Sequence, residues 1–390
     1  MAIALRRRGS MVLAVVIGLA ALAQSQTFTT LHNFTGGSDG ARLYTGVIQD
    51  PSGNLYGTTE LGGDYQNCDP GFGCGVVYKL DTSGRVTALH SFSGNPDGTF
   101  PITSVARDGK GDLYGTTQDG GTGSDGTVFK IDTGGNETVL YSFTGGSDGC
   151  YPNQGLIGDK AGNSYGTTYG CNSSYGTIFK IDSAGNFTLL HSFAGGSSDG
   201  ASPVFGHLTI DQSGNLYGVT GGGGVYNHGV LYQLSTSGTL IVLHSFVGDT
   251  SDGCYPFGSV VQDKAGNLYG TTSSCGSNDA GTIWKMSPTG AETILHNFAG
   301  GGLDGCNPEA GVARDSKGNL YGVTVGCGAN GYGAVYELSA GGKLRLLHSF
   351  DFSDGSNPYG EVTRTRKGTL FGTTEFGGIY DYGTVWSYVP

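Results

Sequence analysis

The chain is built from seven copies of one sequence phrase. Each copy has, with small variations, Ser-Asp-Gly, then Leu-Tyr-Gly-Thr-Thr, then an apolar stretch centred on an aromatic residue, then Leu-His-Ser-Phe. The aromatic residue of the second phrase recurs at a period of about 51 residues, as Tyr56, Tyr114, Tyr165, Tyr217, Tyr269, Tyr321 and Phe371. Repeats of this length are typical of propellers and solenoids, in which each copy buries its apolar face against its neighbours.

One copy predicts four short strands. In the third copy these strands cover residues 154–159, 163–168, 177–182 and 186–193. The connection between the first two is Asp159-Lys160-Ala161-Gly162, and that between the last two is Asp182-Ser183-Ala184-Gly185. Asp bonds to its own turn and Gly accepts a positive φ, so both connections are predicted to be tight turns.

The two ends of the chain are complementary. A fourth-strand sequence at Phe28–Phe34 precedes any first strand, while the last copy ends after its third strand at Tyr388. In a closed ring the N-terminal strand can complete the last blade, and this removes the exposed sheet edges. We therefore predict an all-β fold, a seven-bladed β-propeller of four-stranded blades that forms a single domain over residues 27–390.

The N-terminus has the features of a secretory signal peptide. Three arginines, Arg6 to Arg8, precede an apolar run from Met11 to Ala23, and we expect residues 1–23 to be removed. The run is shorter than the roughly 20 residues of a membrane span. Cleavage leaves 17 basic residues against 32 acidic ones, a net charge of −15. Such a charge disfavours nucleic acid and anionic membrane surfaces as partners. We expect a monomer that is secreted or periplasmic.

The repeat resembles the GloVer tandem-repeat family of exported bacterial proteins. The resemblance is carried by Leu-Tyr-Gly-Thr-Thr, the Gly-Gly that follows it, and Gly-Thr-Val-Phe-Lys at residues 126–130, and it covers nearly the whole mature chain. It implies an exported repeat protein, in some members with a C-terminal surface anchor, and it implies no catalytic residues. No hydrophobic tail or sorting sequence precedes Pro390 here, which puts surface attachment in doubt.

Eight cysteines in an exported chain predict disulfides. Three pairs occupy the same repeat positions and are each centred on the turn between the first two strands of a copy, so their members face each other across a hairpin. No Cys-x-x-Cys spacing occurs and the pairs fall on different copies, which disfavours the alternative of a metal cluster. The predicted bonds are Cys150–Cys171, Cys254–Cys275, Cys306–Cys327 and, from the two remaining cysteines, Cys68–Cys74.

Histidine and aspartate also recur once per copy. The histidines are His32, His90, His191, His244, His296 and His348, with Tyr141 in the remaining copy. They lie one to a blade and cannot converge on a metal ion, so we expect packing or a turn hydrogen bond. The aspartates are Asp39, Asp97, Asp148, Asp199, Asp252, Asp304 and Asp354. An Asp before Gly is a turn-forming residue. We predict no cofactor and no metal, with calcium at the Asp-Gly loops as the alternative.

Candidate binding residues lie where the strict repeat varies. The residue after the proline that opens the first strand is Ile102, Asn153, Val204, Phe257, Glu309 or Tyr359 in successive copies. In a propeller these positions surround the mouth of the central channel, and His207, His228 and Glu361 are further singular residues on the same face. Concave mouths of this kind are favoured binding sites. The predicted ligand residues are Asn153, Phe257, Glu309, Tyr359 and His228.

Three functions follow from these residues. The first is a non-catalytic exported propeller that binds a polysaccharide or a protein at the channel mouth. The second is a polysaccharide lyase or glycoside hydrolase that uses Glu309 and Glu361 as acid and base, with His207 nearby. The third is a structural protein of the cell surface. Alternatively, the variable residues at the mouth form a solvent-exposed rim that binds no ligand.

Overall fold

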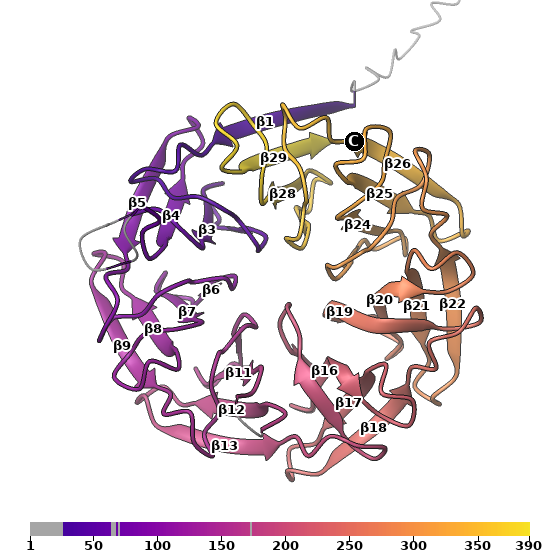
Figure 1. Ribbon diagram of the computed structural model, residues 1–390, viewed down its shortest axis with the longest axis horizontal. Helices are drawn as coiled ribbons and strands as arrows, with labels where there is room; N and C mark the ends of the chain where they lie inside the picture. Colours follow the sequence, from indigo (N-terminus) through magenta and orange to yellow (C-terminus); the bar gives the residue numbers. More distant parts are fainter. Residues whose placement is uncertain (1–25, 64–67, 69–70, 172–173) are drawn as a thin grey trace, which may run out of the picture.

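A computed structural model describes residues 26–63, 68, 71–171 and 174–390. The predicted signal peptide, residues 1–23, lies outside the described residues. The strands form seven sheets placed around a central axis (Figure 1). Blades 1 to 6 are β2–β5, β6–β9, β10–β13, β14–β18, β19–β22 and β23–β26, and blade 7 consists of β27, β28, β29 and β1. The prediction of an all-β, seven-bladed propeller is confirmed.

In blades 1 to 6 the strands follow chain order from the channel outward, and in blade 7 the N-terminal β1 takes the outermost place beside β29. The innermost strands are β2 (Ile48–Gln49), β6 (Ala106–Arg107), β10 (Ile157–Gly158), β14 (Gly200–Pro203) with β15 (Thr209–Ile210), β19 (Gly253–Gln262), β23 (Ala313–Arg314) and β27 (Thr363–Arg364). The second strands are β3 (Leu55–Thr59), β7 (Leu113–Thr117), β11 (Ser164–Thr168), β16 (Leu216–Gly223), β20 (Leu268–Cys275), β24 (Leu320–Thr324) and β28 (Leu370–Thr374).

The outer half of each blade is more regular. The third strands are β4 (Val76–Leu80), β8 (Thr127–Ile131), β12 (Thr177–Ile181), β17 (Val230–Leu234), β21 (Thr282–Met286), β25 (Ala334–Leu338) and β29 (Thr384–Val389). The outermost strands are β5 (Val86–Ser91), β9 (Glu137–Ser142), β13 (Phe187–Ser192), β18 (Leu240–Ser245), β22 (Glu292–Asn297), β26 (Leu344–Ser349) and β1 (Thr27–Asn33).

The ring is closed by the N-terminal strand, as predicted. β1 pairs antiparallel with β29, from Thr27 opposite Val389 to Asn33 opposite Thr384. In Figure 1 the indigo β1 lies along the outside of the yellow β29. Without β1, the backbone groups along one edge of β29 would have no partner, and an open strand edge favours pairing with other chains.

The innermost strand of the third copy is shorter than predicted. Residues 154–159 were expected to form one strand, but β10 contains only Ile157–Gly158. The residues before it bond to the neighbouring blade instead, since the hydroxyl of Thr116 donates to the carbonyl of Gln154 at 3.4 Å. An equivalent bond joins Thr373 to the carbonyl of Thr45, at 2.7 Å, between blades 7 and 1. The channel wall is therefore shared between adjacent blades.

The tyrosine of the repeated phrase is held by the turn before its strand. Asp50 accepts hydrogen bonds from the backbone of Asn54 at 2.9 Å, from its side chain at 2.8 Å, and from the hydroxyl of Tyr56 at 3.1 Å. In the last copy, Thr365 stands at the Asp position and Phe371 at the Tyr position. Both partners of this bond are replaced together, which explains why the final copy departs from the repeat at these two positions.

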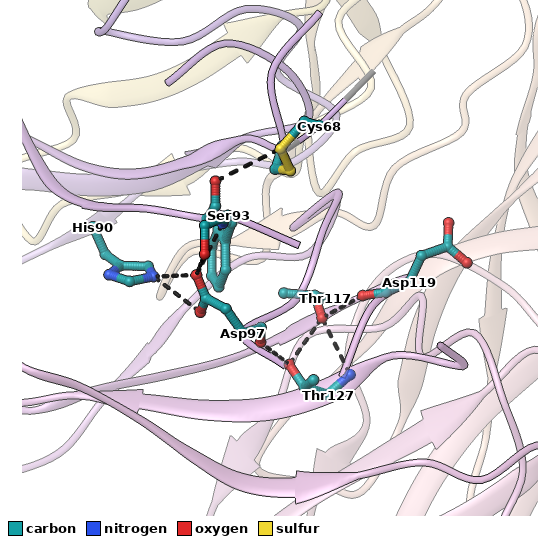
Figure 2. A network of polar contacts seen from close by, with 9 residues as sticks. Cys68, His90, Ser93, Asp97, Thr117, Asp119 and Thr127 are labelled. Atoms are coloured by element: carbon teal, nitrogen blue, oxygen red, sulfur yellow. Dashed lines mark hydrogen bonds and ion pairs between the residues drawn. A yellow bond between two sulfur atoms is a disulfide. The ribbon is translucent and has the colours of Figure 1, made fainter. Parts of the chain in front are cut away.

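The repeated histidine and aspartate fasten the loop that leads to the next blade. His90 Nε2 lies 3.1 Å from Asp97 Oδ1, and the backbone N–H of Ser93 donates to Asp97 Oδ2 at 2.9 Å (Figure 2). The other six copies pair in the same way, with Tyr141 donating its hydroxyl where histidine is absent: His32–Asp39, Tyr141–Asp148, His191–Asp199, His244–Asp252, His296–Asp304 and His348–Asp354. The expected turn hydrogen bond is present, and calcium would compete with these donors for the same oxygens.

Apolar side chains fill the space between blades. Val335 and Phe350 of blade 6 pack with Leu370 and Trp386 of blade 7, and all four are fully buried. The glycine after the repeated tyrosine makes room for the aromatic residue on the third strand of its own blade. At Gly115 an added Cβ would lie 2.5 Å from Cζ of Phe129.

Replacing this glycine is expected to destabilise the blade. Gly115→Ala places a methyl group against the Phe129 ring, and overpacking of this kind costs about 1–3 kcal/mol. Gly109→Ala is the control, because no atom lies within 4 Å of its Cβ position. The measurement is the thermal unfolding midpoint of both variants. Equal midpoints for the two variants would contradict this account of the repeated glycine.

All four predicted disulfides are present, at Cys68–Cys74, Cys150–Cys171, Cys254–Cys275 and Cys306–Cys327. The described chain contains no unpaired cysteine. Disulfides persist in oxidising compartments, so their number is typical of a protein that folds outside the cytoplasm. No helix within the described residues is long and apolar enough to cross a membrane.

Removing one hairpin disulfide should weaken the fold measurably. The bond between Cys254 and Cys275 spans a sequence separation of 21, for which the chain-entropy model gives about 3 kcal/mol. We expect the double variant Cys254→Ser, Cys275→Ser to unfold at lower denaturant concentration than the oxidised parent. If the parent and the double variant shared one midpoint, the bond would contribute nothing to stability.

Candidate functional site

A cavity of about 950 Å³ occupies the central channel. At the mouth, on the face that carries the loops between blades, it is lined by Tyr44, Asn153, Phe205, Glu309 and Tyr359. Toward the other face it is lined by residues of the turns between the first and second strands, including Lys110 and Lys160. Its volume is within the range of small-molecule sites, which are mostly apolar with a few polar groups that fix orientation.

Four aromatic rings form a row across the mouth. The ring centroids of Phe257 and Phe205 are 6.0 Å apart, those of Phe205 and Tyr44 are 6.4 Å apart, and those of Tyr44 and Tyr359 are 5.6 Å apart. These residues come from blades 5, 4, 1 and 7, so the row joins opposite sides of the ring. The hydroxyl of Tyr44 donates to Glu375 Oε1 at 2.6 Å, and burial together with this bond raises its pKa. We call these four residues the aromatic row.

The row depends on a one-residue insertion in the fourth copy. From the glycine before the first strand to the turn aspartate, the third copy runs from Gly149 to Asp159 and the fourth from Gly200 to Asp211, one residue longer. The longer segment carries Phe205 into the cavity lining. Gly206 follows at φ +124°, a conformation that favours glycine, and its carbonyl accepts from the backbone of Gly155 at 2.7 Å.

An ion pair crosses the channel between blades 4 and 7. His207 Nε2 lies 3.4 Å from Glu361 Oε2, and the other oxygen of Glu361 accepts from the backbone N–H of Ser259 at 2.6 Å. The hydroxyl of Ser259 in turn accepts from the backbone of His207 at 2.7 Å. His207 Nδ1 lies 2.9 Å from the carbonyl of Leu208, so both ring nitrogens face acceptors. Three blades are joined by this group.

Both members of the pair are charged at neutral pH. Burial alone would lower the pKa of His207, but the charge of Glu361 and its hydrogen bond outweigh that effect and raise it to about 9. Burial would raise the pKa of Glu361, but His207 and the bonds from Ser259 lower it to about 2. The imidazolium and the carboxylate therefore neutralise each other in the channel.

Two polar groups at the mouth have no partner among the described residues. Asn153 is 6% exposed and its Oδ1 accepts no hydrogen bond. Glu309 is half-buried, lines the cavity, and forms no hydrogen bond or ion pair with the described residues. Burial raises the pKa of its carboxyl, and no neighbouring positive charge opposes that effect. A buried acceptor without a donor is costly, so a ligand that supplies one would be stabilised here.

Most of the sequence-predicted residues meet at the mouth. Asn153, Glu309, Tyr359, His207 and Glu361 all line the cavity. Phe257 is absent from the cavity lining and backs it instead, through its contact with Phe205.

One predicted residue is set apart and two mouth residues were missed. His228 lies on the rim, packed against Tyr255 with ring centroids 5.6 Å apart, and is not part of the cavity lining. Tyr44 was missed because its copy has Leu43 where the proline stands, and Phe205 because the fourth copy is out of register. Counting the residues between the glycine and the turn aspartate in each copy would have revealed the insertion.

Side chains with the composition of a metal site occur only away from the channel in the described part of the chain. Two equivalent groups, His90 with Asp97 and Glu137, and His244 with Asp252 and Glu292, hold their ligand atoms within 4.8 Å of one another. In a third group, Asp125 with Cys150 and Cys171, the two cysteines form a disulfide. Burial, and then the adjacent aspartate charge, raise the pKa of Glu137 to about 7. Protonation of this carboxyl lowers the repulsion between it and Asp97.

The family model described as the Gloeobacter/Verrucomicrobia repeat matches residues 18–209 and 205–390. The chain belongs to the Gloeobacter/Verrucomicrobia repeat family. The resemblance stated from the sequence is confirmed, and this repeat forms a closed ring of blades. No curated protein matches the chain.

Solved structures share the fold of this Gloeobacter/Verrucomicrobia repeat protein at low identity. The extracellular domain of BT4673 from B. thetaiotaomicron has a TM-score of 0.58 and 10% identity, with 93% of this chain and 40% of that chain covered. The periplasmic gluconolactonase PpgL from Pseudomonas aeruginosa has a TM-score of 0.53 and 14% identity, with 86% and 99% covered. A putative 6-phosphogluconolactonase from Bacteroides uniformis has a TM-score of 0.50 and 17% identity, with 77% and 83% covered. These similarities concern the fold alone.

The pair of His207 and Glu361 should give stability a defined pH dependence. The raised pKa of His207 contributes stability that is complete below 6.5 and lost as pH rises through about 9. The lowered pKa of Glu361 contributes stability that is complete above 4.5 and lost as pH falls through about 2. The melting temperature of the parent should therefore exceed that of Glu361→Gln by the largest margin between about pH 4.5 and 6.5, where both contributions are complete. A constant difference at every pH would show that the charges do not interact.

Proposed function

We propose that this is an exported protein, secreted or periplasmic, that binds a carbohydrate at the channel mouth without transforming it. The observation that carries the proposal is that three rings of the aromatic row line one cavity together with two unpaired polar groups, Asn153 and Glu309. Sugar rings present apolar C–H faces that stack on aromatic rings, and hydroxyl groups that can donate to an amide or carboxylate oxygen. The mouth offers both kinds of partner within the same cavity.

Carbohydrate is favoured over a protein ligand by the shape of the site. Three rings of the aromatic row, those of Tyr44, Phe205 and Tyr359, and the unpaired acceptors line a concave cavity rather than a flat surface. Protein interfaces of stable complexes usually bury about 800 Å² on each partner, an area spread over a broad surface. A sugar unit, or the end of a polysaccharide chain, is small enough to enter the mouth.

The enzyme alternative is weakened by the state of its carboxylates. Glycoside hydrolysis needs one carboxyl group that holds a proton and a second that acts as base or nucleophile. Both oxygens of Glu361 are already engaged, one by His207 and the other by Ser259, and its pKa of about 2 makes it a poor base. Glu309 then has no second free carboxylate partner among the mouth residues described above.

The first test is glycan binding by the oxidised mature protein, combined with a reducing-end assay on every polymer that binds. We expect binding without release of new ends. Tyr359→Ala and Asn153→Ala should each weaken binding on the order of tenfold, since each removes one ring contact or one hydrogen-bond acceptor. Tyr226→Ala is the matched control, because Tyr226 is 51% exposed and lies outside the cavity lining.

Other outcomes would contradict the proposal in different ways. Release of new reducing ends would support the enzyme alternative instead. Absence of binding to neutral, acidic and basic glycans would favour a protein ligand or a structural role at the cell surface. An equal loss of binding in Tyr226→Ala would move the site from the channel mouth to the rim.

A further inference from the structure

The mouth of the channel accepts hydrogen bonds but carries no free positive charge in the described structure. Asn153 Oδ1 is buried without a donor, and the carboxyl group of Glu309 has neither a hydrogen bond nor an ion pair. Asn153 is more than nine-tenths buried and lines the same cavity as Glu309. A ligand that satisfies this end of the cavity must therefore bring donors, and a positively charged donor would satisfy Glu309 best.

The cationic groups that line the cavity are paired or lie at its other end. His207 is paired with Glu361 at 3.4 Å, and Lys130 with Asp112 at 2.6 Å. Lys110 and Lys160 belong to the turns on the opposite face, and Arg107 also lines the cavity there, with its guanidinium beside Gly111 of the same turn. Near the mouth, Arg42 is paired with Glu60 at 3.7 Å and lies over the ring of Phe376. None of these groups neutralises Glu309.

Aromatic faces stand beside this unpaired carboxyl group. Glu309 and Tyr359 occupy the same repeat position in adjacent blades, each directly after the proline that opens the innermost strand. They are close enough for the charge of Glu309 to contribute to the raised pKa of Tyr359. Tyr44 and Phe205 continue the lining from there. Aromatic rings attract an ammonium group through their negative faces, and an adjacent carboxylate strengthens that attraction.

We infer that the sugar unit bound at the mouth is an amino sugar with a free ammonium group, held between Glu309 and the rings of Tyr359 and Tyr44. A hydroxyl group of the same unit donates to Asn153 Oδ1. This inference rests on the proposed function and specifies the ligand of the same site. The alternative of a peptide lysine is less well matched, since a lysine side chain has no ring to stack on the aromatic faces and no hydroxyl group to donate to Asn153.

The test compares three β-1,4-linked oligosaccharides of equal length that differ only at carbon 2, where they carry an amine, an acetamide or a hydroxyl group. These are oligomers of glucosamine, N-acetylglucosamine and glucose. Isothermal titration calorimetry at near-physiological salt should show that the amine series binds about tenfold more tightly than the other two, because hydrogen bonds to charged groups contribute about 1.5–3 kcal/mol.

Glu309→Gln should abolish this preference and leave the weaker binding of the neutral oligomers. Because the mature chain carries a net charge of −15, a cationic oligomer is also attracted without specificity. Glu337→Gln controls for that effect, since it removes the same charge from a residue paired with Arg345 on the outer half of blade 6. We expect Glu337→Gln to retain the preference of the parent.

The outcomes separate this inference from the proposed function. Equal affinity for the three series, or a preference that survives Glu309→Gln, would overturn the ammonium inference while carbohydrate binding stands. Binding of a lysine peptide in preference to the amine series would also overturn it. Failure of every glycan to bind, in this series and in the wider panel, would overturn the proposed function itself.

Discussion

The pairing of β1 with β29 is the constraint on which the remaining structure depends. Seven blades can surround a channel only if the last blade meets the first, and blade 7 lacks its outermost strand until the N-terminal segment supplies it. Closure also brings Thr373 against the carbonyl of Thr45, and the backbone of Arg42 against that of Tyr382. The mouth residues of blades 7 and 1 are neighbours for this reason, and the contact between Tyr44 and Tyr359 follows from it.

The repeat is maintained by contacts that each copy makes in the same way. The turn aspartate holds the tyrosine, the glycine admits the aromatic residue of the third strand, and the histidine and aspartate fasten the loop between blades. Replacements occur in matched sets, as at Thr365 and Phe371. These positions leave little freedom for function, so a specific site must be built where the repeat does not dictate the residue.

The candidate site is made from such departures. Glu361 occupies a position that is Gly46 in the first copy and Gly311 in the sixth, and His207 belongs to the segment that carries an extra residue. The two departures meet across the channel and neutralise each other. Glu309 is left unpaired at the mouth. Thus the carboxylate of Glu361 stabilises the channel wall, whereas that of Glu309 remains available to a ligand.

The sequence by itself determined the number of blades, the four strands of each, the closure of the ring and all four disulfides. These features follow from bonds within one copy or from the offset between the two chain ends, and both are visible as spacing. It also located Asn153, Glu309 and Tyr359 at the mouth, because they vary at one repeat position. Only the tertiary structure decided that His207 pairs with Glu361 and that Phe205 and Tyr44 complete the aromatic row. Those contacts join blades far apart in the chain, and their geometry depends on the curvature of the closed ring and on the path of an inserted residue, which no local pattern encodes.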